Sequence, residues 1–141
     1  MFTTENLKIL KFTYEESNFL EYLLGTPEKR STFIVDGTYP CWIPVDDKHG
    51  SVVSDDSDVN NLLIKGFLIG DDGYHDEEEN EWHMTMSINK DKLEVIENYF
   101  KIELFLSSRG MIDKGEWFRL GVRDVCGMIL KLINVGIYIN F

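Results

Sequence analysis

The spacing closest to a catalytic pattern joins two carboxylates and a lysine in the first half of the chain. Asp36, Asp46 and Lys48 follow the pattern Asp-x9-Asp-x-Lys. Two carboxylates at such positions would hold Mg²⁺, and the lysine would assist the attacking water. The chemistry that these three residues suggest is metal-dependent hydrolysis.

The same three residues resemble the core of the PD-(D/E)xK nuclease superfamily. The resemblance is short and carries three departures. The second acid, Asp46, is an aspartate, Pro44 interrupts the strand that should present it, and Asp36 is better explained by a tight turn with Gly37. Short patterns of this kind arise often by chance. We expect that the chain is not an enzyme, and a nuclease-like enzyme using Asp36, Asp46 and Lys48 is the alternative.

Other metal-binding patterns are incomplete. Asp56, Asp58 and Asn60 match the first ligand positions of a calcium loop, but Asn61 and Phe67 stand where glycine and glutamate are needed. The histidines are far apart in sequence, and none has a second histidine or a cysteine at ligand spacing. We therefore expect neither a metal site nor a cofactor.

Negative charge is the most informative property of the sequence, because it is local. The net charge is −11, and the twelve acids between residues 46 and 81, opposed only by Lys48 and Lys65, account for −10 of it. A focused negative field accelerates the association of a basic partner by roughly 10- to 1000-fold. It also repels phosphates, so we expect no direct binding of nucleic acid. The alternative is that the acids only keep the protein soluble.

We predict a partner-binding surface made of these acids and the aromatic and imidazole groups among them. Tyr74 and Trp82 border the second acidic segment, and aromatic anchors within a charged rim are common in tight interfaces. Core packing is the favoured interpretation of Trp82 and stays open for Tyr74. The predicted binding residues are Asp46, Asp47, Asp55, Asp56, Asp58, Asp71, Asp72, Tyr74, His75, Asp76, Glu77, Glu78, Glu79 and Glu81.

Length and composition fit one domain over residues 1–141. The two cysteines, Cys41 and Cys126, do not suggest a disulfide framework. The first residues lack the basic start and the apolar run of a signal peptide. No apolar stretch reaches the length of a membrane span, of about eighteen residues. We expect a cytoplasmic protein with no membrane contact.

The first half of the chain is expected to contain one helix and several strands. Thr13 and Glu16 form a capping box, and Gly25 with Pro27 ends the helix that follows. Pro40 and Pro44 should confine their strand to a sheet edge. The elements expected here are strand 7–12, helix 13–24, hairpin strands 31–35 and 38–43, acidic loop 46–61, and a strand or short helix over 62–69.

The second half is expected to begin with an alternating strand. Residues 81–88 place apolar and polar side chains on opposite faces, with 70–80 as the tip of a hairpin. The further elements are a helix capped by Asp91 and Glu94, a strand over 102–106, a helix over 119–135 and a closing strand over 136–141. The order predicts an α+β fold with two or three helices packed on an antiparallel or mixed sheet.

The chain as a whole resembles the small acidic immunity proteins by which bacteria neutralise polymorphic or contact-dependent toxins. The resemblance rests on size, charge and general build. It implies a cognate toxin, basic and often a nuclease, bound one-to-one at or near its active site. A related alternative is a phage-encoded inhibitor whose carboxylates mimic nucleic acid.

Overall fold

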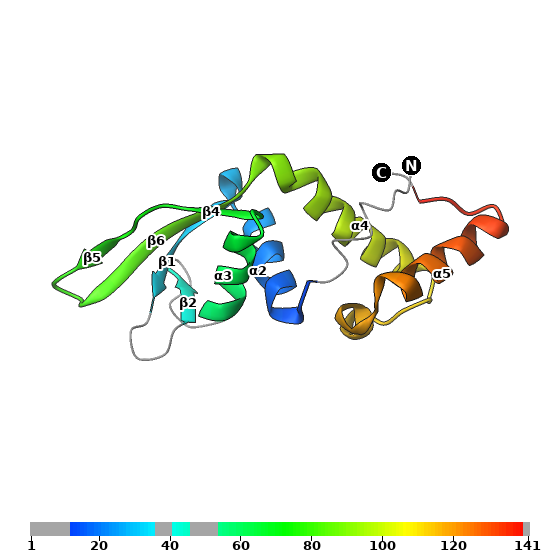
Figure 1. The fold of residues 1–141 in the computed structure, drawn as a ribbon, viewed down its shortest axis with the longest axis horizontal. Coiled ribbons are helices and arrows are strands. Elements are labelled where there is room, and N and C mark those ends of the chain that lie inside the picture. Colours follow the sequence, from blue (N-terminus) through cyan, green and yellow to red (C-terminus); the bar gives the residue numbers. More distant parts are fainter. Residues whose placement is uncertain (1–11, 36–40, 46–53, 140–141) are drawn as a thin grey trace. The chain divides into compact units, whose positions relative to one another are not determined.

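The chain has an α+β fold, as predicted (Figure 1). The computed structural model describes residues 12–35, 41–45 and 54–139. Two compact units divide the chain: a sheet unit, Thr13–Leu93, and a helical unit that combines Met1–Phe12 with Glu94–Phe141. One domain over residues 1–141 stays a prediction. The expected strand 7–12 lies outside the described residues except for Phe12.

Helix α2, Tyr14–Leu24, begins where the sequence predicts. The hydroxyl of Thr13 accepts from the backbone N–H of Glu16 at 3.0 Å, and the Glu16 carboxylate accepts from the Thr13 N–H at 3.2 Å. These two bonds satisfy N–H groups that a helix start leaves unpaired. The helix then buries Phe19, Leu20 and Leu23 completely.

The strands of the described residues form one antiparallel sheet in the order β3-β2-β1-β6-β4, with β5 also paired to β6. Their bounds are β1 Arg30–Val35, β2 Cys41–Pro44, β3 Ser54–Asp55, β4 Leu68–Gly70, β5 Tyr74–Asp76 and β6 Glu81–Ile88. The predicted pairing of β1 with β2 and the predicted strand 81–88 are confirmed. The predicted edge position of β2 is wrong, because β3 pairs with its outer side at Cys41 and Trp42 and Pro44 lies beyond that pairing.

Helices α2 and α3 cover one face of the sheet. Phe33, in the central strand β1, stacks on Phe19 of α2 with 5.0 Å between ring centroids. Trp42 lies on the same face and donates from Nε1 to Asp56 at the start of α3, at 2.9 Å. Helix α3, Asp56–Ile64, corrects one expectation, since residues 56–61 are helix rather than loop. Residues 62–64 belong to the same helix, which is the alternative to a strand that the sequence left open. Of the segment 62–69, only its end is strand, in β4.

A one-residue bulge separates β4 from β5 along the edge of β6. Gly70 pairs with Met86 and Tyr74 with His83, so three residues of the edge face two residues of β6. The predicted hairpin is present, but its tip is shorter than 70–80 because β5 extends the pairing. Gly73, within the bulge, has a φ of +71° and packs directly against β6.

Replacing Gly73 with alanine should destabilise the sheet unit by roughly 2–3 kcal/mol. The new Cβ would lie 2.6 Å from Cγ of Met84 and 2.8 Å from the carbonyl oxygen of His83, in a backbone conformation that disfavours side chains. Gly66 is the matched control, because its φ is +81° but nothing lies within 4 Å of a Cβ there. Gly66→Ala should cost only about 1 kcal/mol. Urea denaturation measures both losses, and equal losses would contradict the tight contact at Gly73.

The helical unit contains α4, Leu93–Ser108, the 3-10 helix η3, Lys114–Arg119, and α5, Val122–Asn134. The predicted strand 102–106 is wrong, since α4 continues through it and buries Ile102 and Leu106 four residues apart. Tyr99 packs its ring 5.0 Å from Phe12 and 5.3 Å from Trp117. The predicted helix over 119–135 corresponds to α5, and Gly136 follows its cap with a φ of +84°.

Two further observations concern the end of the chain and the helices as a whole. Residues 137–139 do not form the predicted closing strand. Among the helices of the described residues, none combines the length and the apolar character needed to cross a lipid bilayer.

Candidate functional site

The two units divide the charge of the chain unequally. The sheet unit contains eighteen acids and six bases, which gives −12, and the helical unit contains seven acids and eight bases, which gives +1. The acidity predicted from residues 46–81 is therefore a property of the sheet unit. Any electrostatic steering of a partner should act on that unit.

Three exposed carboxylates stand on the turn that joins β5 to β6. Oδ1 of Asp76 accepts from the backbone N–H groups of Glu78 at 3.0 Å and Glu79 at 3.3 Å. Asn80 completes the turn with a φ of +52°, which asparagine tolerates, and its side chain bonds to His75 at 3.0 Å. Within the described residues, the side chains of Glu77, Glu78 and Glu79 make no hydrogen bond or ion pair. We call these three residues the acidic tip.

Aromatic side chains lie beside the acidic tip on both faces of the hairpin. Tyr74 stacks on His83 with 5.0 Å between centroids, and on the other face His75 lies 5.3 Å from Trp82. Tyr74 is 59% exposed and Trp82 50% exposed. The prediction that Trp82 packs in the core is wrong. Met86, on the same face of β6, is fully buried, but the packing against that face does not extend along β6 as far as Trp82. Trp42 is buried.

Asp71 is bound within the bulge and does not present a free carboxylate. Its Oδ1 accepts from the backbone N–H groups of Gly73 and Thr85, each at 3.0 Å. The carboxylate thus takes the place of a carbonyl where the bulge interrupts the strand pairing. Asp72, its neighbour, is exposed. Sequence spacing does not distinguish these two acids, because the difference depends on the register with β6.

The acids near the start of α3 form a second group at the other edge of the sheet. Asp55 caps α3 by accepting from Ser57 N at 2.8 Å, and Asp56 holds Trp42. Asp55 belongs to β3, whereas the acidic tip follows β5 at the opposite edge. Four strand spacings of about 4.8 Å place the two edges roughly 19 Å apart. The predicted binding acids that the structure describes therefore belong to two separate groups.

Asp58 lies close to Glu15 and Glu16 of α2, two acids that are not among the predicted binding residues. Burial raises the pKa of Asp58, and the nearby carboxylates of Glu15, Asp55 and Glu16 raise it further. In contrast, hydrogen bonds from the hydroxyl and the N–H of Ser57 lower the pKa of Asp55. Glu16 is fully buried, with Lys65 3.8 Å from it. Only the packing of α2 against α3 brings these residues together, so spacing along the chain carries no signal for them.

Replacing Asp58 with asparagine should stabilise the protein at pH 7, on the order of half a kcal/mol. A raised pKa means that the folded state binds the proton more tightly, so stability falls as pH rises through the window above the ordinary aspartate pKa of 3.8. Asparagine removes the charge and retains the acceptor for the Thr13 hydroxyl. The gain should shrink as pH falls and the wild-type carboxyl becomes protonated. Thermal unfolding between pH 3 and 7 measures it.

Asp72→Asn is the control for this prediction, because Asp72 is exposed and its side chain makes no hydrogen bond or ion pair within the described part of the chain. It should change the unfolding midpoint little at any pH. An Asp58→Asn midpoint at or below that of the wild type at pH 7 would contradict the repulsion described above.

Several predicted residues cannot be placed in either group. Asp36, Asp46, Asp47 and Lys48 lie outside the described residues, so the nuclease-like trio has no structural account. Across residues 12–35, 41–45 and 54–139, no three metal-ligating side chains converge on one point.

The structure therefore contains an acidic sheet unit whose hairpin carries three uncommitted carboxylates between exposed aromatic rings. Comparison of the chain with protein-family models, with curated proteins and with solved structures finds no match in any of the three.

Proposed function

We propose that the chain is an inhibitor of the immunity type, which binds one basic protein partner in the cytoplasm through the hairpin of β5 and β6. The observation that carries the proposal is the acidic tip: Glu77, Glu78 and Glu79 are exposed, and no internal contact of the described residues uses their carboxylates. Side chains that contribute nothing to the fold are available to an interface.

The surroundings of the acidic tip support the same proposal. Asp76 and Asn80 fix the turn by side-chain hydrogen bonds, so a partner meets carboxylates whose backbone is already ordered. Preorganisation lowers the entropic cost of binding. Tyr74 and Trp82 offer large exposed rings within the same hairpin. A charged rim around aromatic anchors is the usual composition of an interface that binds tightly.

Capture from the cells that produce the protein tests the proposal. The tagged chain is used as bait, the bound protein is identified by mass spectrometry, and both proteins are then purified and recombined. We expect a one-to-one complex with a basic protein, and loss of that protein's activity when the chain is added. A complex of another stoichiometry, or full activity of the partner in the complex, would argue against an immunity function.

A further inference from the structure

A groove lies over the open face of the sheet and reaches the end of α2, where Tyr22 also lines it. Thr32 and Thr85 alternate with the buried residues Phe33 and Met86 along β1 and β6, so they lie on the open face. Together with Val45 and Tyr74 they line a groove of about 590 Å³. Grooves of this size accept small organic ligands. This groove shares Tyr74 with the proposed interface, but it does not include the acidic tip and it involves different chemistry.

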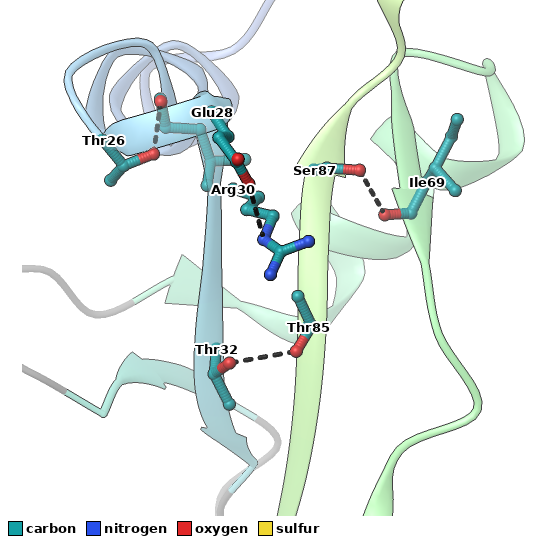
Figure 2. Close-up of polar contacts among 8 residues, drawn as sticks. Thr26, Glu28, Arg30, Thr32, Ile69, Thr85 and Ser87 are labelled. Carbon is teal, nitrogen blue, oxygen red and sulfur yellow. Dashed lines mark hydrogen bonds and ion pairs between the residues drawn. The ribbon is translucent and has the colours of Figure 1, made fainter.

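Arg30 is the cationic group of the groove. Its Nε lies 3.5 Å from Oε2 of Glu28. Among the described residues, no hydrogen bond or ion pair involves its two terminal nitrogens. Figure 2 shows the guanidinium reaching from β1 toward β6, on the side where Thr32 and Thr85 meet. A guanidinium held at Nε presents its terminal N–H groups as a fork, which matches a carboxylate.

A strained turn places Glu28 against Arg30. Glu28 and Lys29 both have positive φ values, 58° and 54°, which residues other than glycine rarely adopt. The turn is held by the Lys29 N–H, which donates to the Thr26 carbonyl at 3.1 Å. The Thr26 hydroxyl also donates, to the Leu23 carbonyl at 2.7 Å (Figure 2). Strain of this kind persists where the surrounding structure imposes it, and it is concentrated at binding sites.

The hydroxyl groups of Thr32 and Thr85 complete the set of donors. Their oxygens are 2.9 Å apart, so one hydroxyl donates to the other. The accepting hydroxyl retains its own hydrogen for a ligand. Pro27, Val45 and the ring of Tyr74 supply apolar lining beside these polar groups.

We propose that this groove binds the carboxylate of a small monocarboxylate or of a polypeptide C-terminus. The terminal nitrogens of Arg30 would donate to both carboxylate oxygens, one threonine hydroxyl would add a third bond, and the apolar lining would cover the rest of the ligand. The −12 charge of the sheet unit opposes ligands that carry several negative charges. Glu28, which also lines the groove, has its carboxylate against Nε of Arg30, so the terminal nitrogens remain for a ligand. The more distant acids are screened beyond about 8 Å at physiological ionic strength, so a single carboxylate is tolerated.

Titration of the ¹⁵N-labelled full chain followed by NMR tests the site with defined probes. Benzoate represents a small carboxylate, N-acetylglycine represents a chain terminus, and benzamide is the uncharged counterpart of benzoate. We expect saturable shifts of the Thr32, Tyr74 and Thr85 amides with at least one carboxylate and not with benzamide. Whichever carboxylate saturates at the lower concentration identifies the source of the ligand.

Arg30→Gln should weaken the binding of that carboxylate by roughly tenfold to hundredfold, because the charged donors are lost. Arg109→Gln is the matched control, since Arg109 is an exposed arginine of the helical unit, stacked over Phe105 at 4.2 Å. It should leave binding unchanged. Equal shifts with benzamide, no saturation with either carboxylate, or unchanged binding by Arg30→Gln would each overturn the proposal.

This test does not depend on the proposed inhibitor function. The titration uses the chain alone, so its failure would leave the capture of a basic partner unaffected. In the same way, the absence of a basic partner would not change the result of the titration.

Discussion

Neutralising the acidic tip by Glu77→Gln, Glu78→Gln and Glu79→Gln together is expected to slow association with the captured partner by about tenfold at low ionic strength. Charges at the rim of an interface act mainly on the rate of encounter, so the dissociation rate should change less. The difference between variant and wild type should shrink as salt is added, because exposed charges are screened. Surface plasmon resonance at several salt concentrations measures both rates.

The matched control for the acidic tip changes the total charge by the same amount elsewhere. Glu94, Glu97 and Glu116 lie in the helical unit, and glutamine at all three positions also removes three negative charges. This variant should retain most of the wild-type association rate. If it slows association as much as the tip variant does, steering depends on net charge and the hairpin has no special role. Unchanged unfolding midpoints would show that both variants keep the fold. We expect this of the tip variant because its three side chains make no hydrogen bond or ion pair with the described part of the chain.

The largest loss of stability is expected from Phe33→Ala, at roughly 3–5 kcal/mol. Phe33 is fully buried in the central strand β1 and contacts three rings: it stacks on Phe19 at 5.0 Å and meets Tyr22 and Trp42 edge-on at 6.1 and 6.2 Å. Alanine removes the ring and leaves a cavity between the sheet and α2. Denaturation by urea, followed by fluorescence and circular dichroism, measures the loss.

Ile34→Ala is the control for this prediction, because the next residue of a strand points to the opposite face. Ile34 is only partly buried on the open face. Its loss should be less than half of that for Phe33. A comparable loss at both positions would mean that the open face is as tightly packed as the covered one.

The elements that were predicted correctly carry their signals within a few residues of the chain. The capping box of Thr13 and Glu16 is a local structure, and it placed the N-cap of α2 at Thr13. The alternation over 81–88 likewise identified β6 and its two faces. It did not reveal how far the helices cover one face, so the exposure of Trp82 could not be read from it. The extent of a cover depends on residues distant in sequence.

In the elements that were predicted wrongly, the spacing of apolar residues fits both a strand and a helix. In α4, Ile102, Leu104 and Leu106 alternate as in a strand, but Ile102 and Leu106 also fit one face of a helix, and Leu104 is 68% exposed. No glycine or proline stands between residues 93 and 108, so nothing stops the helix that begins before them. Asp55 is the N-cap of α3, but an aspartate among neighbouring acids gives no distinct capping signal, so the sequence predicts an acidic loop there.

The sequence predicts which residue types make up the candidate site, but not how these residues are arranged in space. The excess of acids was evident from the sequence, as were Tyr74 and the acids beside it. Their division between two sheet edges follows from the strand order, in which β1 and β6 lie between β2 and β5. The partial burial of His83 beneath Tyr74 and the open fork of Arg30 depend on cross-strand register, which composition does not encode.

The bulge at Asp71–Gly73 also affects how copies of this chain behave at high concentration. Within the described part of the chain, β4 and β5 form the outer edge beside β6, and an open edge is a template on which a second chain can add a strand. The extra residue breaks the regular spacing of backbone groups along that edge, and Asp71 occupies one of the donors of the adjoining strand. Asp72 and the acidic tip then bring like charges together when two such edges approach. The same segment that offers carboxylates to a basic partner thus protects the protein against edge-to-edge aggregation.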